Sequence, residues 1–297
     1  MRSTRLRRPV APPEGSDEDP GLSRAVKLVG SFVANTTLLT ALVFYFGFVY
    51  TQQYFGYFRV HYTLLNQTTP EILARGVDGL FMPLSVVTGA LLIVLCVIRY
   101  VRKRLTADAW SKVLRVSTPL AALAGLALLG AAGFVALDPS HRSLGIPGLP
   151  GLAFAVGVLL LIFAWHRVIA GTNVVEGAIA ILLITIGLFW AVGEYSVALG
   201  RYQGWWEETV RLPTAPDALV YSAKSLNLST RGVHEVVCKQ PDAAYRYRYD
   251  GLKLLLQSGG QLVLLPARWT AESGPAIVLP RTDSIRLEFV TTSAGSC

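Results

Sequence analysis

The stretch Phe44–Tyr62, FYFGFVYTQQYFGYFRVHY, decides the fold because it joins a dense group of aromatic side chains to a long apolar segment. It holds ten of the chain's thirty Phe, Trp and Tyr residues in nineteen positions. No Asp, Glu, Lys or Arg occurs from residue 28 to residue 58. A helix of that length would reach about 46 Å, which exceeds a hydrocarbon core of about 30 Å. The stretch therefore predicts a membrane span that ends among aromatic residues at the membrane surface.

The composition of the whole chain is that of a membrane protein. Hydrophobic residues make up 52% and charged residues 15% of the chain, whereas soluble domains are about a quarter charged. Five charge-poor segments are long enough to cross a bilayer: residues 28–50, 80–101, 116–137, 149–165 and 174–199. The sequence predicts a membrane α-helical bundle of about five transmembrane helices over residues 28–200. A re-entrant segment is the alternative for 149–165, because GIPGLPG precedes it.

The distribution of Lys and Arg predicts the orientation, because positively charged flanks stay in the cytoplasm. Twelve Lys and Arg residues flank the predicted spans on the side of the N-terminus, and five flank them on the other side. The chain is therefore predicted to lie in the plasma membrane with its N-terminus cytoplasmic and its C-terminus outside. We interpret the net charge of +8 as a signal of this topology and of contact with the lipid bilayer, not of nucleic-acid binding. Residues 1–27 are predicted to form a disordered cytoplasmic tail.

The aromatic stretch itself is predicted to lie flat in the membrane interface, after a change of direction at Thr51–Gln53. Ring-rich amphipathic helices favour that region, since Tyr buries its ring there and keeps its hydroxyl wet. The alternative is an aromatic pocket for a lipid or hydrophobic ligand. Beyond the stretch, Thr69 as N-cap and Pro70 predict a short helix that Gly76 closes. The predicted interfacial belt consists of Tyr50, Tyr54, Tyr57, Phe58, Trp205 and Trp206.

Residues 201–297 are predicted to form a small extracytoplasmic β-rich domain. Tyr245, Tyr247 and Tyr249 alternate with Arg246 and Arg248, the period of two that a strand with one wet face shows. The segment Ser258–Gly260 predicts a hairpin turn between two apolar strands. Arg246 and Arg248 are either part of a solvated face or candidates for a saccharide- or phosphate-binding face.

Two further predictions concern single residues. Cys238 and Cys297 are the two cysteines of the outer domain, where oxidising conditions permit a disulfide between them. Glu194 is a functional candidate because carboxylates in predicted spans are rare. It lies eighteen residues beyond Glu176, about 27 Å along a helix. This position predicts an interfacial carboxylate, with the mouth of an ion or proton route as the alternative.

Catalytic motifs do not occur in the sequence. It contains no H-E-x-x-H, C-x-x-C, G-x-x-x-x-G-K or G-x-S-x-G pattern. No catalytic residue, metal ligand or cofactor is therefore predicted. The expected function is that of a non-enzymatic cell-envelope protein that anchors an outer β-domain, which binds a wall component, a lipid or a protein. The alternatives are a channel or transporter subunit and, third, an enzyme acting on lipid or cell-wall precursors, and a homo-oligomer is left open.

Four segments resemble a set of multi-pass membrane proteins that are common in actinobacteria and have no assigned activity. They are FGFVYTQQYFGYF, NQTTPEILARGVDGLF, YRYDGLKLLLQSGG and DSIRLEF. The resemblance covers the membrane part and the outer domain. It implies origin and architecture and carries no functional residues.

Overall fold

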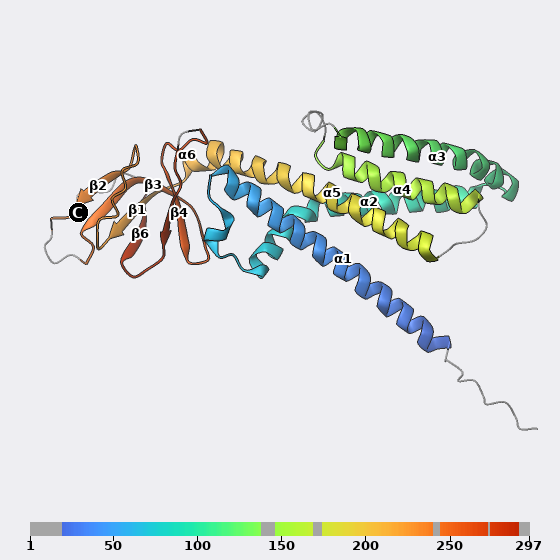
Figure 1. Cartoon of the computed structure of the whole chain (residues 1–297), viewed down its shortest axis with the longest axis horizontal. Coiled ribbons are helices and arrows are strands. Elements are labelled where there is room, and N and C mark those ends of the chain that lie inside the picture. The colour runs from blue at the N-terminus through green and yellow to red at the C-terminus, as the bar shows by residue number, and fades with distance from the viewer. Residues whose placement is uncertain (1–19, 138–145, 169–173, 240–243, 273, 291–297) are drawn as a thin grey trace, which may run out of the picture. The chain divides into compact units, whose positions relative to one another are not determined.

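The computed structural model describes residues 20–137, 146–168, 174–239, 244–272 and 274–290. The chain divides into two compact units, Met1–Ala41 and Leu42–Cys297. Helices occupy the first two thirds of the described chain and strands the last third (Figure 1). The helical elements are α1 (Pro20–Tyr57), η1 (Tyr62–Leu65), α2 (Thr69–Arg104), α3 (Ala107–Leu137), α4 (Leu149–Val168), α5 (Val174–Trp206), η3 (Glu207–Arg211) and α6 (Leu212–Thr214).

Four helices in the described part of the chain are long and apolar enough to cross a membrane, one fewer than predicted. The predicted spans 80–101, 116–137, 149–165 and 174–199 lie in α2, α3, α4 and α5. The segment 149–165 lies in a full helix of 20 residues, which does not support the re-entrant alternative. The first predicted span, 28–50, lies in α1 but is not among the four. The side chains of α1 before residue 36 are described only in part, so this span stays a prediction.

The unit Met1–Ala41 contains the first part of α1. Residues 1–19 of the predicted tail lie outside the described residues, but residues 20–27 are helical rather than disordered. The hydroxyl of Thr37 donates to the carbonyl of Val33 at 2.9 Å, and that of Thr40 to the carbonyl of Thr36 at 2.9 Å. Both hydroxyls are therefore satisfied within their own helix.

The predicted change of direction at Thr51–Gln53 is wrong, because α1 continues without interruption to Tyr57. Glycines bring α1 and α2 close together in this region. A Cβ on Gly47 would lie 2.1 Å from the carbonyl oxygen of Ile72, and one on Gly76 would lie 2.2 Å from that of Val43. Gly76 thus provides a close helix contact and does not end a short helix. The N-cap of α2 is Thr68, not Thr69.

Small residues also mediate the contacts among α3, α4 and α5, which lie side by side (Figure 1). A Cβ on Gly157 of α4 would lie 3.0 Å from the carbonyl oxygen of Gly125 in α3. One on Gly151 would lie 2.3 Å from the backbone nitrogen of Ala191 in α5. Such close backbone approach is typical of helix pairs in membranes. Helices associate there mainly through van der Waals packing, and small residues allow the backbones to come close.

Helix α5 and its continuation extend well past the predicted domain boundary at residue 200. Helical structure runs from Val175 to Thr214 over 40 residues, about 60 Å at 1.5 Å per residue. The first strand begins only at Asp217. We call residues 217–290 the sheet domain. It begins later than the predicted domain 201–297, since the helix carries the chain up to the sheet.

The sheet domain is a six-stranded antiparallel sheet with the order β5-β4-β3-β1-β6, in which β2 also pairs with β3. Its strands are β1 (Asp217–Ser222), β2 (His234–Val237), β3 (Tyr247–Ser258), β4 (Gln261–Pro266), β5 (Ile277–Pro280) and β6 (Ile285–Val290). The predicted hairpin turn is present between Ser258 and Gln261. Gly259 and Gly260 occupy it with φ of 55° and 74°, which glycine adopts without strain.

Apolar side chains cover both faces of the sheet. One face holds Val220, Tyr249, Leu252 and Leu264, all fully buried. The hydroxyl of Tyr249 donates to Glu235 at 2.8 Å and accepts from the backbone N–H of Leu226 at 2.6 Å. A buried tyrosine is thus fully satisfied in its hydrogen bonding.

Cys238 directly follows β2, and its N–H donates to the carbonyl of Arg246 at 2.9 Å. It is disulfide-bonded, whereas Cys96 is a free thiol. Cys297 lies outside the described residues, so its pairing with Cys238 stays a prediction. We expect membranes that are alkylated before lysis to yield a Cys238–Cys297 peptide pair in non-reducing mass spectrometry. Recovery of both cysteines in alkylated form without reductant would contradict it.

Candidate functional site

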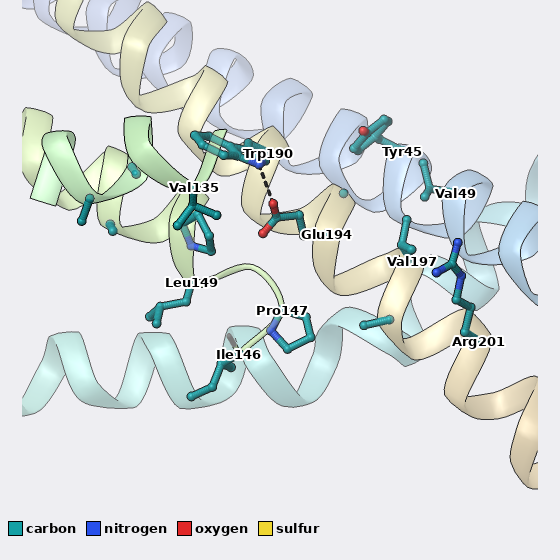
Figure 2. A pocket seen from close by; sticks show the side chains of 16 residues that line it. Tyr45, Val49, Val135, Ile146, Pro147, Leu149, Trp190, Glu194, Val197 and Arg201 are labelled. Carbon is teal, nitrogen blue, oxygen red and sulfur yellow. Dashed lines mark hydrogen bonds between the residues drawn. The ribbon is translucent and has the colours of Figure 1, made fainter. Parts of the chain in front are cut away.

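A pocket of about 900 Å³ lies between α1, α3, α4 and α5 within the unit Leu42–Cys297 (Figure 2). Most of its lining is aliphatic, with the ring of Trp190 from α5 and that of Tyr45 from α1. Glu194 and Arg201 of α5 are the ionisable groups other than Tyr45 among the lining residues. The pocket is thus an apolar chamber with one carboxylate and one guanidinium at its wall.

The Glu194 carboxylate is held by two N–H donors. The indole nitrogen of Trp190 donates to Oε1 at 2.8 Å, and the backbone N–H of Gly148 donates to Oε2 at 3.2 Å. Figure 2 shows the first of these bonds inside the pocket. Gly148 has φ of 85°, a backbone conformation that favours glycine and turns the chain into α4. The prediction of Glu194 as a candidate therefore falls on a residue of the pocket, held in a fixed orientation.

Arg201 lies two helical turns beyond Glu194 on the same side of α5, which places the two groups about 10 Å apart along the axis. Its Nε donates to the side-chain oxygen of Gln53 in α1 at 3.2 Å. Arg201 and Trp190 are not among the site residues predicted from the sequence. The signal was present in the spacing, because residues 190, 194 and 201 differ by four and seven and so share one face of a helix.

The predicted aromatic belt has a different location from the one expected. Tyr54 and Phe58 are 5% and 0% exposed and lie in protein, and Tyr50 and Tyr57 pack against the same cluster. Trp205, by contrast, is 48% exposed, and Trp206 is half-buried. We call this cluster the aromatic core; its buried members are Tyr54, Phe55, Phe58, Val60, Leu65, Leu212, Leu255, Val263, Leu265 and Trp269.

The aromatic core joins the end of α1 to the sheet domain. The ring of Phe58 lies 5.1 Å from that of Trp269 and 5.4 Å from that of Tyr54, measured between centroids. Glycines of α5 admit α1 to this contact, since a Cβ on Gly200 would lie 2.8 Å from the carbonyl oxygen of Tyr50. The rings thus lie against side chains of the sheet domain, among them Leu255, Val263 and Leu265. This corrects the belt prediction for Tyr54 and Phe58.

Polar contacts surround the aromatic core. Glu208 accepts a hydrogen bond from the Tyr57 hydroxyl and another from the backbone N–H of Ala271 at 3.0 Å. Arg59 donates to the carbonyl of Ala271 at 2.8 Å. The buried ammonium of Lys253 donates to the carbonyl of Ala215 at 2.8 Å, just after the last helical turn. Helices and sheet are therefore fixed to one another by both apolar packing and hydrogen bonds.

The Tyr57 hydroxyl supports a prediction on pH. Burial and the hydrogen bond to the Glu208 carboxylate raise the pKa of Tyr57 to about 12. Because the folded protein favours the neutral phenol, this contact stabilises the fold at neutral pH. Its contribution is lost as the pH rises from about 10, the pKa of an unperturbed tyrosine, through 12.

We expect the tyrosinate absorbance of the Tyr57→Phe variant to lack one late-titrating group compared with wild type. Tyr202→Phe, which removes an exposed ring hydroxyl, is the control and should keep the late-titrating group of Tyr57. A Tyr57 that titrates near pH 10 would show that the bond to Glu208 is absent in solution.

The predicted Tyr/Arg face of β3 is divided between buried and exposed groups. Arg248 is only 5% exposed and pairs with Asp250, with Nε and Oδ1 2.9 Å apart. The hydrogen bond to Asp250 is the main cause that raises the pKa of Arg248. Arg246, in contrast, is exposed. The alternation correctly separates the two faces of the strand, but Arg248 is an internal ion pair and is not free for a ligand.

The exposed end of this face carries a second group. The guanidinium of Arg286 lies over the rings of Tyr221 and Tyr245, 5.2 and 5.9 Å from their centroids, and also pairs with Glu288. Because β1 pairs with β3 and β6, Arg248, Tyr221 and Arg286 stand in register across three strands. Together with Tyr245 and Arg246, these three residues form a group of rings and guanidinium groups, which we call the Tyr/Arg surface.

No protein-family model, no curated protein and no solved structure matches this chain. Within the described residues, no group of three His, Cys, Asp or Glu side chains is placed to hold a metal ion. The candidate sites are therefore defined by their own geometry: the pocket at Glu194 and the Tyr/Arg surface of the sheet domain.

Proposed function

We propose that this chain is a non-enzymatic multi-pass protein of the plasma membrane that presents its sheet domain to the cell envelope. The observation that supports this proposal is the aromatic core, which packs the sheet directly against the end of α1 and against Leu212 of α6. A flexible linker would leave the domain free to turn, whereas a shared core holds it at a set height and orientation. Such a rigid attachment suits a domain that binds a partner at a fixed distance from the bilayer.

The Tyr/Arg surface is the part of the sheet domain that we assign to the partner. Guanidinium groups bind phosphate and carboxylate with two parallel hydrogen bonds, and tyrosine rings offer a flat face for stacking. These groups suit an anionic or saccharide component of the envelope. Arg248 is paired with Asp250 and Arg286 with Glu288, so the guanidinium group that we assign to the partner is that of Arg246. An origin in an actinobacterial envelope remains part of the proposal.

The orientation is tested by reporter fusions. We expect fusions after Leu137 and after Cys297 to report the extracytoplasmic side of the membrane, and a fusion at the N-terminus to report the cytoplasm. The reason is that Lys and Arg residues are more numerous on the side of the N-terminus, and positively charged flanks stay in the cytoplasm. A cytoplasmic signal from the C-terminal fusion would contradict the proposed presentation of the sheet domain.

Binding is tested by purifying the full chain in mild detergent and identifying co-purifying glycans, lipids and proteins by mass spectrometry. We expect an envelope component whose recovery falls in the Arg246→Ala, Tyr245→Ala double variant. Arg268→Ala is the matched control, because Arg268 is equally exposed on the sheet domain but lies in a turn after β4. A ring-shaped oligomer that conducts ions after reconstitution, with no component retained, would replace this proposal with that of a channel subunit.

A further inference from the structure

We infer that the pocket between α1, α3, α4 and α5 binds one phosphate-bearing membrane lipid. The apolar chain would lie against α3 and α4, and the phosphate would meet Arg201. The Glu194 carboxylate would accept a hydrogen bond from a hydroxyl or N–H in the part of the lipid that links the two. This site is separate from the Tyr/Arg surface, and of the function proposed above it requires only that the helices span a membrane.

The size and lining of the pocket suit an amphiphile. Its volume of about 900 Å³ lies in the range of about 300 to 1,000 Å³ that ligand pockets have. Ala132 and Val135 of α3 and Ala153 of α4 give it small apolar walls. A purely polar ligand would make no apolar contact with these walls. A purely apolar ligand would offer no hydrogen-bonding partner to Glu194 and Arg201.

Glu194 is prepared to accept a further hydrogen bond. A carboxylate offers about four lone-pair sites, and Trp190 and Gly148 occupy two of them. One donor lies in α5 and the other in the turn that precedes α4, so the carboxylate is fixed before any ligand arrives. Preorganised acceptors of this kind select ligands with a matching donor, because the ordering cost is already met.

Arg201 is prepared in the same way for an anion. Its Nε is bound to Gln53, which orients the guanidinium, while its terminal nitrogens make no hydrogen bond or ion pair within the described residues. Two free parallel N–H groups match the geometry of a phosphate. An exposed arginine such as Arg201 could simply be solvated. Solvation does not explain why Glu194, seven residues earlier, is held by hydrogen bonds in the same apolar pocket.

The depth of the two groups agrees with the position of a lipid headgroup. Glu194 lies eighteen residues beyond Glu176, near the start of α5, and about 27 Å of helix separates them, close to the thickness of a hydrocarbon core. With α5 as a span, Glu194 stands at the boundary of the hydrocarbon and Arg201 about 10 Å beyond it. A lipid in that leaflet would place its chain below Glu194 and its phosphate beyond it.

Native mass spectrometry of the full chain in detergent tests the inference with three probes: phosphatidylglycerol, diacylglycerol with the same acyl chains, and inorganic phosphate. We expect one phosphatidylglycerol per chain, binding by diacylglycerol that is weaker by about tenfold or more, and none by phosphate alone, since a charge-assisted hydrogen bond carries at least that factor. Equal binding of diacylglycerol would overturn the role of Arg201. Binding of free phosphate with the same affinity would overturn the lipid.

Two variants localise the site, and one serves as control. Arg201→Ala should weaken phosphatidylglycerol binding by about tenfold, and Ala198→Trp should abolish it by filling the pocket. Ala178→Trp lies on an exposed side of the same helix and should bind like wild type. Unchanged binding by the first two variants would overturn the inference. The reporter fusions test the topology independently, so a failure of the proposed function would not be mistaken for a failure of this site.

Discussion

The Phe58→Ala variant is expected to lose about 3 to 5 kcal/mol of stability, the cost of removing a buried phenylalanine from a packed core. Phe58 is 0% exposed and contacts the rings of Trp269 and Tyr54. Its removal leaves a cavity between α1 and the sheet domain that neither side can fill without moving. Thermal unfolding of the full chain in detergent, followed by tryptophan fluorescence, measures the effect.

Phe44→Ala provides the matched control. Phe44 belongs to the same helix and the same aromatic stretch, but it is 38% exposed and its ring stacks on that of Phe48, with 6.4 Å between the ring centroids. We expect a loss of less than about 1.5 kcal/mol, because much of that ring contacts no protein. If both variants shift the unfolding temperature equally, Phe58 is not in a protein core and the interfacial belt would be restored.

The turn between β3 and β4 supports the second large effect. Gly259 has φ of 55°, and a Cβ there would lie 1.7 Å from the carbonyl oxygen of Leu65 in η1. Gly259→Ala therefore forces the hairpin away from η1. We expect a loss of about 2 to 5 kcal/mol in the same unfolding experiment, from left-handed strain together with overpacking.

The neighbouring glycine separates these two causes. Gly260 also has a positive φ, 74°, but a Cβ there would meet nothing within 4 Å. Gly260→Ala should cost only the backbone strain, about 1 to 2 kcal/mol. Equal losses in the two variants would indicate that the hairpin does not touch η1 in solution.

The sequence alone predicts the parts of this fold that depend on local pattern. Charge-poor segments of sufficient length identify α2 to α5, because span length and apolarity are properties of single helices. The hairpin at Ser258–Gln261 is equally local, since two glycines between apolar runs favour a tight turn. The position of Glu194 also follows from counting along one helix.

The aromatic core could not be predicted in the same way. Tyr54 and Phe58 form an apolar face that a membrane interface and a protein core reward alike, and the partner that decides, Trp269, is more than two hundred residues away. The glycines of α5 carried part of the signal, because Gly200 and Gly204 mark where another helix can approach. Such a pattern shows that a partner exists without showing which one.

The prediction that Arg248 could bind a ligand is wrong for a related reason. The alternation of Tyr and Arg along β3 indicates two faces, but it does not show that Asp250, two residues on and therefore on the same face, neutralises the guanidinium. Pairing at a spacing of two, together with burial by neighbouring strands, turned a predicted binding residue into a structural one. Grouping Arg201 with Glu194 and Trp190 in one pocket likewise required the packing of α1, α3 and α4 around α5.

Hydrogen exchange of β4 in the Phe58→Ala variant tests most directly whether the sheet domain and the end of α1 form one folded unit. Val263 and Leu265 of β4 lie in the aromatic core with Phe58. Removal of the Phe58 ring should therefore destabilise β4, although this strand is far from Phe58 along the chain. We expect faster exchange at the amides of residues 261–265 in Phe58→Ala than in wild type and in Phe44→Ala. Identical protection of β4 in all three proteins would contradict it.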